Sequence, residues 1–364
     1  MADSLTKKLE IFLRKHINNF LNFKGNQVYC HKPGSAFKFG EIRKILLLRQ
    51  DRIGDVLVST PTIRALRNKL TNTRIDILLG DKNFNISSAV EPYVNNIYRH
   101  KKKFLGFVKL IKFLRQEKYD LIIDMFDNPS ATSTIIIKFS NPRYSLGIEK
   151  ENKRVYSHLT PLLQKSSTHI VRRIANLLMP FGINPDTEDL SLEYHLSEKE
   201  KKSSEINLPK KNKAIRLGLN LSGSSDEKYW GIENNINFIN KINEKYKNIE
   251  IILFYTENLR DDMNKILKNA NAIAAPITES IRDYAIGLST CDIIVTPDTS
   301  AVHFAAAWKI PCLAMFELSD ERYGMPWLPY NSPNKIILTR EGTLKSISVE
   351  VALAVFGELY KVSF

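Results

Sequence analysis

Cysteine is scarce in this sequence, with three among 364 residues. Cys30, Cys291 and Cys312 lie far apart, and none belongs to a CxxC or Cys/His pattern. This argues against a disulfide framework and against a structural zinc site. Long apolar runs are also missing, because none approaches the roughly 20 residues that cross a bilayer. The N-terminus has no small-residue cleavage site of a secretory signal, so we expect a cytoplasmic protein.

Four common catalytic signatures are missing as well, namely GxxxxGK[ST], GxGxxG, GxSxG and HExxH. Their absence weakens the interpretations as ATPase, dehydrogenase, serine hydrolase and zinc protease. Acidic residues are fewer than basic ones, 39 against 53, which gives a formal net charge of +14. This excess favours an anionic partner, such as nucleic acid, an anionic membrane surface or a phosphorylated substrate.

Apolar strand patterns alternate with helical patterns from Lys44 to about residue 181, and again from about residue 214 onward. Such alternation predicts two doubly wound parallel-sheet α/β domains, Rossmann-like and facing a cleft. We place the domains at 43–185 and 213–342, with a polar, lysine-rich linker at 186–212. A C-terminal helix is expected at 343–364.

An N-terminal amphipathic helix and loop are expected at 1–42, because residues 1–22 carry apolar side chains at helical spacing with lysines elsewhere. This helix either lies on a membrane surface or packs on the protein. We favour packing.

The first stretch of chemical interest is the turn from Arg49 to Asp55, which follows a predicted strand and leads into a helix. Parallel sheets bind ligands at the carboxyl ends of their strands, where this turn lies. Asp55 is either a helix-capping residue or a general base that Arg49 and Arg52 keep ionised. Pro61 marks either the first turn of the helix or a kink within it.

A second stretch, TPDTS, joins another predicted strand to a helix. The first amides of a helix and the positive end of its dipole suit an anion such as a diphosphate, and Thr299 and Ser300 add hydroxyl donors. Asp298 is either the helix N-cap or a contact to a sugar hydroxyl. His303 lies one turn into the helix and is either structural or a ligand contact.

A third stretch, NLSGSSDEKYW, follows the predicted strand at 214–221. It is a polar loop in which Lys228 supplies a mobile positive charge suited to phosphate. Taken alone, a lysine in a polar loop is more often solvated.

Together and in this order, these stretches resemble glycosyltransferase family 9, the lipopolysaccharide heptosyltransferases. The family's "IGD(V)…TP…R(A)L" block and its "DTG..H..AA...P" block correspond here to Ile53, Gly54, Asp55, Val56, Thr60, Pro61, Arg64, Ala65 and Leu66, and to Asp298, Thr299, Ser300, His303, Ala305, Ala306 and Pro311. The resemblance implies the GT-B fold, in which the N-terminal domain receives the acceptor and the C-terminal domain binds the nucleotide sugar. It also implies that the last helix crosses back onto the first domain.

The resemblance also implies roles for single residues. Asp55 corresponds to the catalytic base and Lys228 to the phosphate-binding lysine. The residues assigned to the donor are Ser222, Glu257, Asp298, Thr299, Ser300 and His303, and those assigned to the acceptor are Arg49, Arg52, Gly54 and Thr60. Glu257 corresponds to an acidic residue that holds the ribose. Two positions depart from the family, since Ser300 and Glu317 stand where it has glycine.

The reaction implied is inverting, metal-independent transfer of a heptose from ADP-heptose to a sugar hydroxyl of the lipopolysaccharide core, without a cofactor. Alternatives are a family member that uses another nucleotide sugar, such as a hexose donor, and, far behind, a basic nucleic-acid-binding protein. The lipid-linked acceptor implies peripheral contact with the anionic inner face of the bacterial inner membrane. Residues 100–118 carry the apolar stripe Phe104, Phe107, Val108, Ile111 and Leu114, which we expect to pack on the sheet while the lysines face outward.

Overall fold

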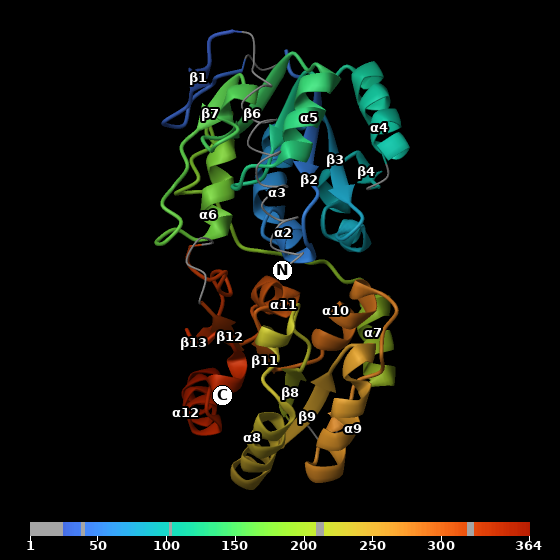
Figure 1. The fold of residues 1–364 in the computed structure, drawn as a ribbon, viewed down its shortest axis with the longest axis vertical. Helices are drawn as coiled ribbons and strands as arrows, with labels where there is room; N and C mark the ends of the chain where they lie inside the picture. The colour runs from blue at the N-terminus through green and yellow to red at the C-terminus, as the bar shows by residue number, and fades with distance from the viewer. Residues whose placement is uncertain (1–24, 38–40, 102–103, 209–214, 319–323) are drawn as a thin grey trace, which may run out of the picture. The chain divides into compact units, whose positions relative to one another are not determined.

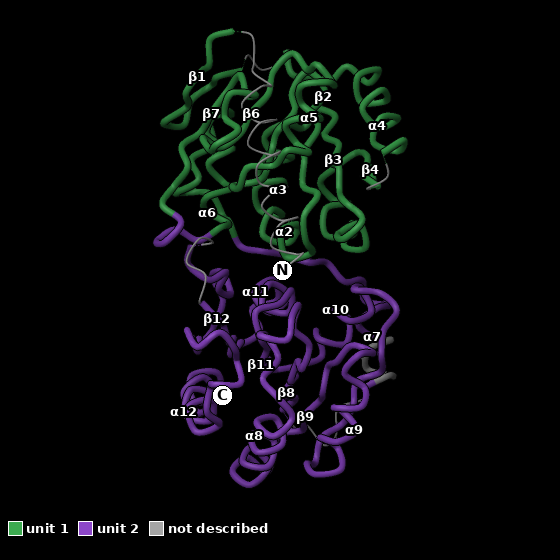
Figure 2. Tube along the Cα trace, viewed as in Figure 1, with its two compact units in different colours: residues 1–164, 170–190 green, residues 165–169, 191–364 purple. Residues whose placement is uncertain are grey.

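The computed structural model describes residues 25–37, 41–101, 104–208, 215–318 and 324–364 (Figure 1). The helix expected over residues 1–22 lies outside these ranges. The chain divides into two compact units, with residues up to 164 and 170–190 in unit 1, and residues 165–169 and 191–364 in unit 2 (Figure 2).

Unit 1 is built on a parallel sheet in which seven strands follow the order β1-β7-β6-β5-β2-β3-β4. Its strands are β1 (Val28–Tyr29), β2 (Lys44–Arg49), β3 (Arg74–Gly80), β4 (Asn96–His100), β5 (Leu121–Asp124), β6 (Tyr144–Ile148) and β7 (His158–Thr160). The central strand β2 is buried from Ile45 to Arg49, as expected of a parallel strand that is covered on both faces. Strands β1, β6 and β7 were not predicted from the sequence.

Helices cover both faces of this sheet (Figure 1). The helices are α2 (Ile53–Leu57), α3 (Thr60–Lys69), α4 (Phe104–Glu117), α5 (Ala131–Ser140) and α6 (Ile170–Ala175), with short 3-10 turns η1 (Phe84–Ala89), η2 (Glu91–Tyr93), η3 (Lys153–Val155) and η4 (Asn176–Leu178). Helix α4 packs with α5, and α3 packs with α6. Pro61 lies in the first turn of α3, a separate helix, so the interpretation as a kink is wrong.

Unit 2 holds a second parallel sheet, with the order β10-β9-β8-β11-β12-β13. Its strands are β8 (Ile215–Asn220), β9 (Ile249–Phe254), β10 (Ile273–Ala274), β11 (Ile293–Pro297), β12 (Cys312–Glu317) and β13 (Asn334–Thr339). Its helices are α7 (Glu198–Asn207), α8 (Ile232–Lys245), α9 (Arg260–Asn269), α10 (Ile281–Leu288), α11 (Ser300–Trp308) and α12 (Val349–Ser363), with 3-10 turns η5 (Asp226–Lys228), η6 (Glu257–Leu259) and η8 (Leu344–Ser346).

Two expectations about the domain connections differ from the structure. The segment expected to link the domains contains α7, which packs on α10 within unit 2. The last helix, expected to cross onto the first domain, belongs to unit 2, where α12 packs on α8 and β13. Phe356 explains this position, because its buried side chain belongs to the same hydrophobic cluster as the core residues of β8, β9 and α8.

Both sheets have the strand order of a doubly wound fold. From β2 in unit 1 and from β8 in unit 2, the chain adds strands to one side of this central strand, then returns and builds outward on the other side. In unit 1, β1 precedes β2 in the chain and lies at the far edge, beside β7. The order reverses between β2 and β5 in unit 1 and between β8 and β11 in unit 2. Crevices at the carboxyl ends of such strand pairs are where doubly wound proteins bind ligands. The predicted pair of doubly wound, parallel-sheet α/β domains is confirmed.

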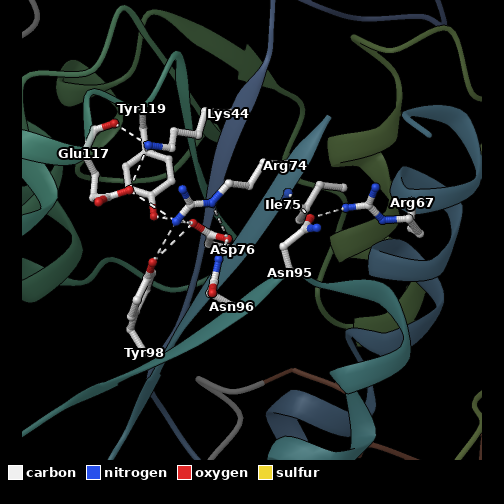
Figure 3. A network of polar contacts seen from close by, with 10 residues as sticks. All are labelled: Lys44, Arg67, Arg74, Ile75, Asp76, Asn95, Asn96, Tyr98, Glu117 and Tyr119. Carbon is white, nitrogen blue, oxygen red and sulfur yellow. Dashed lines mark hydrogen bonds and ion pairs between the residues drawn. The ribbon is translucent and has the colours of Figure 1, made fainter. Parts of the chain in front are cut away.

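A buried polar network lies at the opposite, amino end of the unit 1 sheet (Figure 3). Asp76 on β3 is fully buried and binds Arg74 through an ion pair of 2.8 Å. Its carboxylate also accepts hydrogen bonds from the Tyr119 hydroxyl at 2.6 Å and the Asn96 amide at 2.9 Å. Arg74 is the first residue of β3, so the network lies at the amino end of this strand. It is therefore at the opposite end of the sheet from the carboxyl ends of the strands, where doubly wound proteins bind ligands.

All three cysteines are buried, and none of them forms a disulfide. Burial raises the pKa of the Cys30 and Cys312 thiols above their ordinary value. Within the described residues, no helix is both long enough and apolar enough to cross a membrane.

Candidate active site

Asp55 lies in the first turn of α2, directly beyond the carboxyl end of β2, and 7% of its surface is exposed. One carboxylate oxygen accepts a hydrogen bond from the backbone N–H of Arg52 at 3.0 Å. The other forms an ion pair of 3.0 Å with Arg49. Asp55 therefore has the capping role that the sequence suggested. A carboxylate oxygen can accept two hydrogen bonds, so the same group retains acceptor capacity for a substrate proton.

Arg49 holds this turn in place. Its guanidinium donates to the Asp55 carbonyl at 2.9 Å, to the Asp55 carboxylate at 3.0 Å and to the Met125 carbonyl at 2.9 Å. These bonds join the ends of β2 and β5 across the point where the strand order reverses. Because Arg49 is only 1% exposed and three of its five N–H groups bond within the turn and to Met125, it is a positioning residue and not the predicted acceptor contact.

The other residues assigned to the acceptor divide into two groups. Thr60 is fully buried, and its hydroxyl donates to the Leu57 carbonyl at 2.8 Å, so the prediction of an acceptor contact is wrong for this residue. Arg52 is exposed and Gly54 is half-buried, and both remain predicted acceptor contacts.

More buried charge surrounds this edge of the sheet. Asp124 at the end of β5 is fully buried and pairs with Lys150 at 3.0 Å. Burial lowers the pKa of the Lys150 ammonium from its ordinary value. Close by in sequence, Asp127 pairs with the buried Arg173 at 2.9 Å. Ionisable groups in such surroundings gather at functional sites, although structural networks also contain them.

In unit 2, the structure brings Lys228 and Asp298 together. Lys228 ends η5, and its ammonium forms an ion pair with the carboxylate of Asp298, which follows β11. The two side chains are 22% and 33% exposed. The interpretation of Lys228 as a merely solvated residue is therefore wrong.

Thr299, and not Asp298, is the N-cap of α11. Its hydroxyl accepts a hydrogen bond from the Ala301 N–H at 3.3 Å, so the interpretation of Asp298 as the cap is wrong. The amide of Asn220 donates to the hydroxyls of Thr296 and Thr299, at 3.0 and 3.2 Å. Asn220 ends β8, so these bonds tie the carboxyl ends of β8 and β11 together where the strand order reverses.

His303 and Ser300 lie in the first half of α11. Ser300 is half-buried at the first position of the helix. His303 is 4% exposed, and its ring centroid lies 6.2 Å from that of Trp327. The ring of His303 is therefore enclosed by protein rather than presented to solvent.

Ser222 and Glu257 lie beyond the ends of the neighbouring strands β8 and β9. The Ser222 hydroxyl is 3.1 Å from that of Thr256, which joins the two loops. Glu257 binds Arg260 through two contacts of 2.6 and 2.8 Å, and this hydrogen bonding lowers the pKa of its carboxyl. The Glu257 side chain is 66% exposed, so it is open to a ligand.

Sequence reasoning missed two residues of this site, Asn220 and Gly223. A Cβ atom on Gly223 would lie 2.6 Å from the Lys228 carbonyl oxygen, so the loop needs glycine to approach Lys228 closely. An asparagine that ends an apolar strand was the available signal for Asn220. Within the described residues, no cluster of three or more His, Cys, Asp or Glu side chains is placed to hold a metal ion.

Two parallel-sheet α/β units, each with a polar cluster where its strand order reverses, have the architecture of the GT-B fold of two-domain glycosyltransferases. Residues 107–352, more than half of the chain, match the family "Glycosyltransferase family 9 (heptosyltransferase)". The chain belongs to this family, as the resemblance predicted. The matched residues include Lys228 and the turn at Asp298, whereas Asp55 precedes them.

Known proteins agree with this assignment. The chain is 23% identical over 304 residues to lipopolysaccharide heptosyltransferase 3 of Escherichia coli. The alignment covers 75% of this chain and 83% of that protein. Its fold is similar to that of a family 9 glycosyltransferase from Veillonella parvula, with a TM-score of 0.75, 15% identity and coverage of 91% and 100%. It is also similar to E. coli ADP-heptose lipopolysaccharide heptosyltransferase II, with a TM-score of 0.70, 20% identity and coverage of 88% and 99%.

Proposed function

We propose that this protein transfers a heptose from ADP-heptose to a sugar hydroxyl of the lipopolysaccharide core, with inversion at the anomeric carbon. The names of the E. coli relatives support this donor and this kind of acceptor. A lipid-linked acceptor would place the enzyme at the cytoplasmic face of the inner membrane. The observation that carries the proposal is the Lys228–Asp298 pair beside the start of α11.

Unit 2 would bind the donor. An ammonium group has three N–H donors, so Lys228 can keep its bond to Asp298 and still contact the diphosphate. The start of α11 adds the positive end of a helix dipole and the hydroxyl of Ser300. These groups would stabilise the negative charge that develops on the departing ADP, a role that needs no metal ion. Glu257, exposed beyond β9, is suited to accept hydrogen bonds from the ribose hydroxyls.

Unit 1 would supply the base. In a single displacement, Asp55 takes the proton of the acceptor hydroxyl while the acceptor oxygen bonds to the anomeric carbon. The bond from that carbon to the diphosphate oxygen breaks, and its electron pair leaves with ADP. Attack opposite the leaving group gives inversion. Arg49 holds the Asp55 carboxylate in a fixed direction for this step.

The direct test is mass measurement of the product after incubation with ADP-heptose and truncated core acceptors, with and without EDTA. Asp55→Asn should lower turnover by roughly 10²- to 10⁴-fold while ADP binding is retained. Asp81→Asn is the matched control, because Asp81 follows β3 and forms an ion pair with Arg99 in which the two side chains are 36% and 44% exposed. Unchanged turnover in Asp55→Asn would remove Asp55 from the mechanism, and loss of activity with EDTA would reject metal independence.

A second candidate is a member of the same family that uses another nucleotide sugar, such as a hexose donor. Ser300 favours it, because a side chain is added at the start of α11 where the family has glycine. A panel of ADP-, UDP- and GDP-sugars in a hydrolysis assay separates the two candidates. Turnover of a hexose donor with none of ADP-heptose would reject the first candidate.

A further inference from the structure

Helix α4 exposes large apolar side chains at its N-terminal end. Phe104 is 80% exposed, Leu105 is 74% exposed and Val108 is 50% exposed. The sequence predicted that Phe104 and Val108 would pack on the sheet, and this is wrong. We call these three residues the apolar tip of α4.

The packing of α4 explains why the apolar tip is left outside. Leu114 is fully buried in the core of unit 1, and Phe107, Leu110 and Phe113 pack against the same core. These residues already provide the face of α4 that the sheet covers. Phe104, Leu105 and Val108 lie on the opposite face of the helix, so the core of unit 1 does not bury their side chains.

Cationic side chains share this outer face. Leu105, Lys109 and Lys112 recur at helical spacing, i, i+4 and i+7. Lys109, Lys112 and Arg115 are all exposed, as is Lys101 just before the helix. The outer face of α4 therefore combines an apolar end with a row of positive charges.

This combination selects the kind of partner. A purely anionic ligand would leave the apolar tip in water, and a purely apolar one would bury unpaired cations at high cost. An anionic lipid bilayer meets both demands, because acyl chains receive apolar side chains while headgroups attract lysine and arginine. We propose that the outer face of α4 docks on an anionic membrane, with Phe104, Leu105 and Val108 inserted at the interface. This proposal deepens the membrane location proposed above, but its evidence is the surface of α4 and not the donor or the chemistry.

The test is co-sedimentation of the full chain with phosphatidylcholine vesicles, with and without about one-third phosphatidylglycerol. We expect binding to the anionic vesicles that weakens with added salt, because salt screens the headgroup attraction. Phe104→Ser/Leu105→Ser/Val108→Ser should reduce the partition coefficient by roughly tenfold or more. Lys109→Gln/Lys112→Gln should reduce it by about fivefold for each lysine.

Val362→Ser/Phe364→Ser is the matched control. These residues, 75% and 56% exposed, are apolar side chains at the end of α12 in unit 2, so their replacement should leave vesicle binding unchanged. An equal loss in this control, or full binding by the triple serine variant, would overturn the proposal. So would wild-type binding that ignores anionic lipid.

A second measurement reports the surroundings of the apolar tip directly. Tryptophan emission of Phe104→Trp, taken as the difference from wild type, should shift to shorter wavelength only when anionic vesicles are added. A shift already present without vesicles would mean that another part of this chain or a second copy covers the tip, and would overturn the proposal. The triple serine variant should retain activity on a soluble truncated acceptor, so failure of membrane docking is distinguishable from failure of the proposed reaction.

Discussion

Removal of Arg49 should destabilise unit 1 because it leaves a charge buried without its partner. In Arg49→Met, the Asp55 carboxylate keeps the hydrogen bond from the Arg52 N–H but loses the guanidinium. The Met125 carbonyl loses a donor at the same time. Breaking a buried ion pair from one side costs about 3–5 kcal/mol, and the side chains here are 1% and 9% exposed. We expect a loss of about that size in the free energy of unfolding.

The double variant Arg49→Met/Asp55→Leu tests the reason for this loss. With both charges gone, no unpaired ion remains, and apolar replacement of a buried pair is often nearly neutral. The double variant should therefore be more stable than Arg49→Met, with a coupling energy of about 2 kcal/mol or more between the two sites.

Urea unfolding followed by far-UV circular dichroism measures these free energies. All three tryptophans, Trp230, Trp308 and Trp327, lie in unit 2, so their fluorescence follows that unit separately. The circular dichroism transition should move and the fluorescence transition should not, if the two units unfold independently. Additive effects of the two single substitutions, or a cost below about 1 kcal/mol for Arg49→Met, would refute the reasoning.

Three further predictions concern stability, the donor loop and pH. Asp76→Ala should lower the free energy of unfolding by about 3–5 kcal/mol, measured by urea denaturation, because it leaves buried donors without an acceptor. Gly223→Ala should weaken ADP binding by roughly tenfold in calorimetry, because a Cβ 2.6 Å from the Lys228 carbonyl forces the loop to move. The Arg282 guanidinium lowers the pKa of the Glu200 carboxyl to about 2 from 4.5. The resulting stabilisation should be complete above about pH 4.5 and lost as pH falls toward 2, seen as a stability difference between wild type and Arg282→Met that vanishes over that range.

Each of these predictions has a control or a contrary outcome. Asp81→Ala removes an exposed ion pair beyond the other end of β3 and should cost less than about 1 kcal/mol. If Asp76→Ala and Asp81→Ala lowered the free energy of unfolding equally, burial of the carboxylate would not explain the loss. If Gly223→Ala binds ADP with wild-type affinity, the loop of Gly223 does not contribute to the donor site. A constant difference between wild type and Arg282→Met from pH 6 to pH 2 would contradict the assignment to Glu200.

Sequence reasoning succeeded where local signals decide the structure. Strands such as β2 and β11 are largely apolar runs, and the TPDTS turn leads directly into α11 as predicted. Strand β6 has the sequence YSLGI and β7 has three residues, so neither has a pattern of its own. Pairing with neighbouring strands stabilises β6 and β7, and the sequence alone does not show which strands pair.

The limits at the candidate site have the same origin. Asp298 looked like a helix cap because the sequence does not reveal that Lys228, 70 positions earlier, lies beside it. Arg49 and Thr60 have residue types that suit ligands, and only the fold shows that both are buried. The position of Asp55 in the turn and first helical residues after β2 could be predicted, because it is a local property of the sequence. Long-range packing, by contrast, determines which polar residues remain available to a substrate.

The buried cysteines leave the described surface without a native thiol that reacts readily. The thiolate is the reactive form, and burial disfavours it at Cys30 and Cys312. A cysteine introduced on an exposed helix of each unit would therefore accept a maleimide dye in preference to the native thiols. With one dye in each unit, energy transfer would report the distance between the two labelled sites, and adding ADP would show whether that distance changes.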